Sequence, residues 1–171
     1  MVTRVKRLYL LRHAKSAWDD PTLRDHERPL APRGRKAARR MARWAKKHGV
    51  RPQLVVCSDA VRAQETLQGV LPGLGEPTVR VEATLYAAGG ETLLARVRAL
   101  PEDVDVAMLV GHNPGVVDLL LLLAAPCVLL DRAREHLPTG ALAELQTGVE
   151  HWADVSPGAA RLTEFVLPRE L

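Results

Sequence analysis

Four side chains that could bind and attack an anion stand within five residues after short apolar stretches of this 171-residue chain. They are Arg12, His13, Arg62 and His112. The apolar stretches cover residues 8–11, 54–57 and 106–110, and such runs are typical of strands buried on both faces. Because ligands bind at the carboxyl ends of parallel strands, three neighbouring strands would bring the four side chains to one edge of a sheet.

Two imidazoles and two guanidiniums without a fixed carboxylate describe an anion pocket, and forked guanidinium donors fit phosphate best. Arg62 falls in the first turn of a helix predicted over about residues 60–68, where free backbone N–H groups favour anions. An arginine there opposes the helix dipole, which fits a residue kept for its ligand. A surface ion pair with Asp59 is the alternative.

The remaining elements alternate between strands and helices. Further strands are predicted over residues 78–81, 141–146 and 161–167, and further helices over 32–48, 91–100 and 114–124. In the last of these helices, Asn113 is expected as the N-cap and Pro114 as the first residue. The segment from Pro126 to Pro138 has no clear periodicity and is expected to be irregular. The pattern predicts a single α/β domain over residues 1–171.

A net charge of +4 indicates affinity for anions without choosing among nucleic acid, lipid and small phosphates. The one feature that could indicate nucleic acid is the basic helix face within residues 33–47. A solvated amphipathic helix is the favoured interpretation, because no aromatic residues are interleaved to stack bases and no binding motif accompanies the charge.

Neither a metal site nor a membrane segment is predicted. The two cysteines, Cys57 and Cys127, lack metal-type spacing, and no acidic cluster could hold Mg²⁺. The most apolar stretch, residues 116–130, falls short of the ~18 apolar residues that a membrane span needs. The N-terminal apolar run is too short for a signal peptide, so we expect a cytoplasmic protein without a cofactor.

The order of three motifs along the chain is more specific than any one of them. The motifs are Arg12-His13, Ser58-x-x-x-Arg62-Ala63-x-x-Thr66 and Gly111-His112-Asn113. Together they resemble the histidine phosphatase superfamily, which includes the cofactor-dependent phosphoglycerate mutases. The longer string from Arg12 to Asp19, followed by Arg28-Pro29-Leu30 and Arg33-Gly34, is similar to the small branch that contains the SixA-type phosphohistidine phosphatases.

The resemblance implies a three-layer α/β/α sandwich, with a mostly parallel sheet and an antiparallel edge strand. It also implies that His13 attacks phosphorus to form a phosphohistidine intermediate, which water then hydrolyses. Arg12 and Arg62 would clamp the non-bridging oxygens, and a protonated His112 would add a third cationic donor. Ser16, Asn113 and Asp19 are expected to contact the substrate, Asp19 at a position where relatives have a phosphate-binding Asn.

Two positions depart from the family pattern. Ala14 follows the nucleophile where Gly is usual, and Ala87 stands where phosphomonoesterases of the family carry an acidic Glu. Expelling an alkoxide needs a proton donor worth ~10²–10⁴ in rate, whereas imidazole leaves more readily. The missing acid therefore favours phosphohistidine or another activated phosphoryl donor, unless Asp19, Asp25 or Glu82 replaces it.

Our leading hypothesis is a metal-independent phosphatase that uses His13 and acts on phosphohistidine in a partner protein. One alternative is a phosphomonoesterase acting on a small phosphorylated metabolite, with Asp19 or Asp25 as the acid. The other is a non-catalytic protein that binds phosphate, or nucleic acid through the basic helix. Mutase activity is disfavoured because the chain is short and shows no acid.

Overall fold

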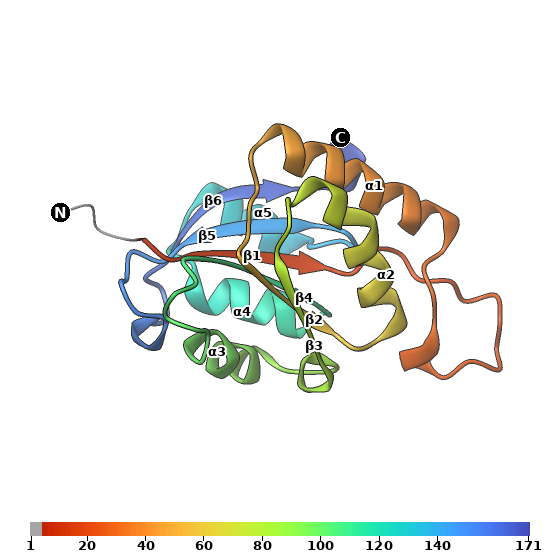
Figure 1. The fold of residues 1–171 in the computed structure, drawn as a ribbon, viewed down its shortest axis with the longest axis horizontal. Helices are drawn as coiled ribbons and strands as arrows, with labels where there is room; N and C mark the ends of the chain where they lie inside the picture. Colours follow the sequence, from red (N-terminus) through yellow and green to blue (C-terminus); the bar gives the residue numbers. More distant parts are fainter. Residues whose placement is uncertain (1–4) are drawn as a thin grey trace.

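A six-stranded mixed sheet forms the centre of the computed structural model, which describes residues 5–171 (Figure 1). The strands lie in the order β3-β2-β4-β1-β5-β6. In chain order they are β1 Arg7–Arg12, β2 Leu54–Ser58, β3 Thr78–Glu82, β4 Val106–Gly111, β5 Leu142–Gln146 and β6 Arg161–Val166. The first four are mutually parallel, so β1, β4 and β2 end at one edge of the sheet.

The predicted fold class is confirmed, but the place of the antiparallel strand is corrected. That strand is β5, which pairs antiparallel with β1 on one side and with β6 on the other. It lies one position in from the edge, because the chain returns after β5 and adds β6 along its free side. The edge strand β6 therefore runs in the same direction as β1.

Helices cover both faces of the sheet and make it the middle of three layers (Figure 1). One face carries α1 Pro32–Lys47 and α2 Val61–Val70, and the other carries α3 Gly90–Arg98, α4 Gly115–Leu123 and α5 Val128–Glu135. Five short 3-10 turns also lie within the described residues: η1 Asp25–Glu27, η2 Leu71–Gly73, η3 Ala83–Leu85, η4 Trp152–Asp154 and η5 Pro168–Glu170. None of the helices in residues 5–171 is long and apolar enough to cross a membrane.

Alternating side chains of β1 fill two separate cores. Leu8 and Leu10 pack into the core beneath α3, α4 and α5, whereas Tyr9 and Leu11 pack into the core beneath α1 and α2. Successive residues of a strand point to opposite faces, so a run that is apolar throughout belongs between two helical layers. The buried runs of β2 and β4 divide between the same two cores.

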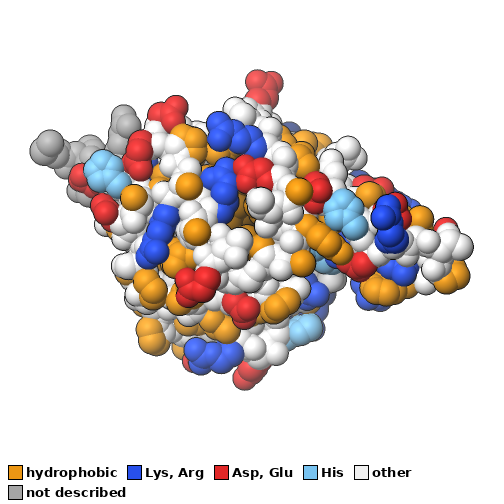
Figure 2. All heavy atoms as spheres, turned by 90° about the horizontal axis from the view of Figure 1, so that it is seen from below, with side chains coloured by type: hydrophobic (Ala, Val, Ile, Leu, Met, Phe, Trp, Pro, Cys, Tyr) orange, Lys and Arg blue, Asp and Glu red, His pale blue; other side chains and the backbone are white. Residues whose placement is uncertain are grey.

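The basic helix is α1, whose buried side contains Ala38, Met41 and Ala45 at helical spacing. It begins at Pro32, as predicted, and the chain leaves it at His48 and Gly49, where Gly49 takes a positive φ of 67°. The segment between β1 and α1 projects from the body of the molecule in both views (Figure 1 and Figure 2). Figure 2 also shows that the face over α3 mixes charges of both signs.

Two local predictions were wrong. Residues 126–138 are not irregular throughout, because Val128–Glu135 forms α5 and buries only Leu130 and Ala133. So narrow an apolar contact leaves little periodicity in the sequence. The helix α4 begins at Gly115 with Pro114 as its N-cap residue, since the side chain of Asn113 donates to a carbonyl oxygen elsewhere and does not cap the helix.

Candidate active site

The parallel strands β1, β4 and β2 bring together the four side chains singled out in the sequence. Arg12 ends β1 and His13 follows it, His112 follows β4, and Arg62 lies in the first turn of α2 after β2. The rings of His13 and His112 are 5.0 Å apart between centroids, and Nε of Arg62 donates to Nε2 of His13 over 3.3 Å. The expected convergence at the carboxyl edge of the sheet is thus present.

Backbone and side-chain hydrogen bonds hold His13 on both sides. Its N–H donates to the carbonyl of Gly111 over 3.0 Å, and its carbonyl accepts from the N–H of Gly140 over 2.9 Å. Nδ1 lies 2.7 Å from the carbonyl oxygen of Ala14, whose own N–H donates to Oγ1 of Thr66 over 2.9 Å. Because a carbonyl oxygen only accepts, Nδ1 carries the proton and Nε2 keeps its lone pair.

Burial is the main reason why His13 is neutral. It lowers the pKa of His13 from 6.5 to about 4, and the positive charges of Arg62 and Arg12 lower the pKa further. The carbonyl of Ala14 and the carboxylate of Asp25 act in the opposite direction. At neutral pH the imidazole is therefore uncharged and nucleophilic at Nε2.

His112 is neutral for a similar reason. Burial, followed by the influence of His13 and Arg62, lowers the pKa of His112 to about 3. Nε2 of His112 is hydrogen-bonded to Oγ of Ser58 over 2.8 Å, which leaves Nδ1 as the ring nitrogen without a partner in residues 5–171. At neutral pH this ring is therefore uncharged, in contrast to the cationic donor considered from the sequence.

Arg12 and Asn113 share one backbone acceptor on the far side of the site. Nη1 of Arg12 donates to the carbonyl of Leu137 over 2.7 Å, and Nδ2 of Asn113 donates to the same oxygen over 3.2 Å. Four buried side-chain polar atoms in residues 5–171 have no hydrogen-bond partner, and three of them belong to Arg12, His112 and Asn113. Buried polar groups are rarely left unpaired, so this concentration marks a site for a polar ligand.

Asp25 is the candidate acid that the structure places closest to the two histidines. Its backbone carbonyl and Oδ2 accept from Nη1 and Nη2 of Arg62 over 2.6 and 2.9 Å, and Oδ2 also accepts from the Tyr86 hydroxyl over 2.7 Å. The Tyr86 hydrogen bond, and then Arg62, lower the pKa of Asp25. The carboxylate, whose side chain is 50% exposed, is therefore ionised at neutral pH.

Ser16, Asp19 and Glu82 are the other residues proposed from the sequence, as substrate contacts or as acids. Both carboxylate oxygens of Glu82 accept from Arg96 over 2.7 Å, which commits that side chain to an ion pair. Oγ of buried Ser16 accepts from Nε1 of Trp18 over 3.1 Å. Asp19 lines a cavity of about 670 Å³ together with Ser16, and no hydrogen bond or ion pair joins its side chain to His13 or His112.

Three further residues hold the site: Ser58 and Thr66, which the sequence motifs contain without a role, and Tyr86. Thr66 is the one whose spacing carried a signal, because a threonine four residues after Arg62 on a helix can bond back to its carbonyl, as it does over 2.6 Å. Tyr86 reaches Asp25 across 61 residues, which no local pattern predicts. Within residues 5–171, no group of three or more His, Cys, Asp or Glu side chains could hold a metal ion.

A doubly covered α/β sheet with paired histidines and arginines at its carboxyl edge defines a class of phosphoryl-transfer protein. The family model of the histidine phosphatase superfamily, branch 1, matches residues 8–86. An uncharacterised Mycobacterium tuberculosis protein, Rv1276c, is 36% identical over 163 residues, which cover 93% of this chain and all of the relative.

Two solved structures show the same similarity. The SixA protein of Nakamurella multipartitia superimposes with a TM-score of 0.85 and is 31% identical over 96% of both chains. The SixA protein of Agrobacterium tumefaciens gives 0.83 and 32% identity over 95% of this chain and 98% of its own. The chain belongs to the histidine phosphatase superfamily, in its SixA-type branch, and is a histidine-dependent phosphatase.

Proposed function

We propose that the substrate is a phosphohistidine on a partner protein and that His13 is the nucleophile. The observation that carries this proposal is the state of Asp25. Its carboxylate accepts hydrogen bonds from Arg62 and Tyr86, which stabilise the ionised form. An ionised carboxylate cannot protonate an alkoxide, whereas the imidazole of phosphohistidine leaves without so strong a demand for an acid.

The first half of the reaction forms a bond from Nε2 of His13 to phosphorus and breaks the bond from phosphorus to the substrate imidazole. The leaving nitrogen takes its proton from solvent. Nδ1–H of His13 stays bonded to the carbonyl of Ala14, which stabilises the charge that the ring acquires. In the second half, water attacks phosphorus, the bond to His13 breaks and phosphate is released.

The donors around Nε2 of His13 are suited to the charge that spreads over the phosphoryl oxygens. Nε of Arg62 is already at Nε2, and the buried Nε of Arg12 and Nδ1 of His112 lack partners in the described part of the chain. A phosphoryl group accepts from all three kinds of donor. Of the residues expected to contact substrate, Asn113 lies beside Arg12 on the shared carbonyl of Leu137, and we include it in this binding site.

A second candidate function is hydrolysis of a small phosphomonoester, with Asp25 as the acid. It is favoured by one observation, that the negative charge of Asp25 acts on both His13 and His112. For this function Asp25 would have to be protonated during the reaction. The hydrogen bonds from Tyr86 and Arg62 oppose that protonation, because they lower the pKa of Asp25.

Phosphate release from three substrates separates the two functions. The substrates are a histidine-phosphorylated protein, p-nitrophenyl phosphate and an alkyl phosphate, each assayed with EDTA present. We expect wild type to act fastest on the protein, His13→Ala to be inactive and Asp25→Asn to retain most of its activity on phosphohistidine. If the alkyl phosphate is the best substrate and Asp25→Asn loses about 10²-fold or more on it, Asp25 is the acid and the phosphomonoesterase function holds.

A cytoplasmic location is part of this proposal.

A further inference from the structure

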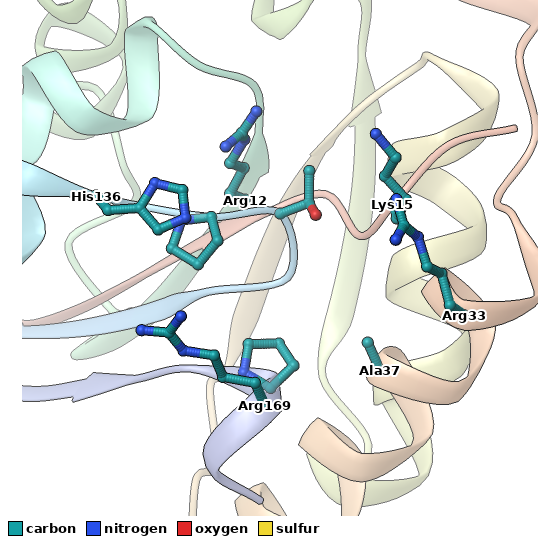
Figure 3. A pocket seen from close by; sticks show the side chains of 9 residues that line it. Arg12, Lys15, Arg33, Ala37, His136 and Arg169 are labelled. Carbon is teal, nitrogen blue, oxygen red and sulfur yellow. The ribbon is translucent and has the colours of Figure 1, made fainter. Parts of the chain in front are cut away.

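A second concentration of positive charge lies beside the candidate active site, on the other side of Arg12. It is a cavity of about 490 Å³. The lining residues come from four separate segments and are Arg12, Lys15, Arg33, Ala37, His136, Pro138, Thr139, Pro168 and Arg169. Figure 3 shows Lys15 and Arg33 on one side, His136 and Arg169 on the other, and Arg12 between them.

The cavity contains no carboxylate, and its outer cations are unpaired. Within residues 5–171, the side chains of Lys15, Arg33 and Arg169 have no hydrogen bond or ion pair with another residue. Two surface arginines outside the cavity pair with acids: Arg24 with Glu27, and Arg132 with Glu170. Several like charges around one cavity repel each other, and an anionic ligand would relieve that repulsion.

The beginning of α1 adds to this preference for an anion. Its N-cap is Ala31, which makes no side-chain capping hydrogen bond, and its first turn contains no acidic residue. Arg33 lies in that turn, where the helix dipole disfavours a cation. An arginine at this position is best explained by a negative group that approaches both its guanidinium and the free N–H groups of the helix.

From this cavity we infer a second, anionic subsite: carboxylates on the substrate protein, close to its phosphohistidine, bind Lys15, Arg33 and Arg169 while the phosphoryl group binds at His13. The inference rests on the proposed function. Arg12 lines the cavity and also belongs to the phosphoryl site, so one substrate surface reaches both. Cations from separate segments around an open space fit several spread carboxylates better than one compact ion.

The test uses two synthetic histidine-phosphorylated peptides that are identical except that four glutamates flanking the phosphohistidine in one are glutamines in the other. The variant is R33Q/R169Q, and the control is K36Q/K46Q, which removes the same charge from exposed positions of α1 outside the cavity. We expect R33Q/R169Q to lower kcat/KM about 3- to 30-fold more for the glutamate peptide than for the glutamine peptide. This difference should shrink in high salt, and the control should change the ratio by less than about 2-fold.

An unchanged ratio in R33Q/R169Q would overturn the subsite, as would an equal change in the control. If wild type hydrolyses neither peptide, the proposed function fails, and the subsite is then judged by titration calorimetry with the unphosphorylated glutamate peptide. Weaker binding of that peptide to R33Q/R169Q than to K36Q/K46Q would support the subsite on its own. Equal binding to both variants would reject it.

Discussion

Acid should destabilise this fold through the two histidines of the site before its carboxylates are protonated. His13 and His112 are each only 7% exposed, and their pKa values are lowered to about 4 and about 3. In the unfolded chain both return to the ordinary histidine value of 6.5. A lowered pKa means that the native state resists protonation. The contribution of the two neutral histidines to the free energy of unfolding is therefore complete above pH 6.5 and is lost as the pH falls.

The size of the loss by pH 5 depends little on the exact native values, because pH 5 lies above both of them. Each unfolded histidine gains a proton over about 1.5 pH units, at about 1.4 kcal/mol per unit, or about 2 kcal/mol. The two histidines together should lower the free energy of unfolding by about 4 kcal/mol between pH 7.5 and pH 5. That is a large part of the 5–15 kcal/mol typical of a domain.

Urea unfolding at pH 7.5 and pH 5 measures this loss directly. For each variant, the loss is the difference between its own free energies of unfolding at the two pH values. The single variants His13→Asn and His112→Asn should each show about half of the wild-type loss, and the double variant should show little of it. Exposed His136 provides the control, and His136→Asn should keep the full loss. If the double variant lost as much stability as wild type, the histidines would not be neutral in the native state and our account of the nucleophile would be wrong.

Two further predictions concern packing and positioning. Gly34→Ala should lower the free energy of unfolding by about 1–3 kcal/mol in urea, because its new Cβ would overlap the carbonyl oxygen of Lys15, whereas Gly89→Ala, with nothing within 4 Å, should be tolerated. Thr66→Val should cost about 1–3 kcal/mol by leaving the buried N–H of Ala14 without its acceptor. It should also lower kcat, and a Thr66→Ser variant, which restores the hydroxyl, should recover both; failure of Ser to recover kcat would argue against this positioning role.

The convergence of the site was predictable because it depends on strand ends. Three apolar runs that are each followed within five residues by a histidine or arginine need only be parallel neighbours to form the pocket, and the order β2-β4-β1 makes them so. The place of β5 was not predictable in the same way, since pairing partners of an antiparallel strand depend on contacts distant in sequence. The helix α5 was missed because its apolar residues do not mark one face. Val128 is apolar but 78% exposed, and only Leu130 and Ala133 are buried.

The network around Asp25 lay beyond the sequence for another reason. Asp25 belongs to a segment with few apolar residues, so no periodicity fixes where it folds. Its place follows from Arg62 and Tyr86, which lie 37 and 61 residues further along the chain. Sequence could nominate Asp25 as an acid, but only the structure shows the hydrogen bonds that stabilise its charged form further.

The main chain of His13 is hydrogen-bonded on one side to Gly111, at the end of β4, and on the other to Gly140, just before β5. Although His13 follows β1, its backbone is therefore tied to the sheet on both sides. Hydrogen exchange at such an amide requires the strands to separate, which occurs only when the whole domain opens. His13 should thus stay in position until the protein unfolds globally, so that activity and structure disappear together on heating.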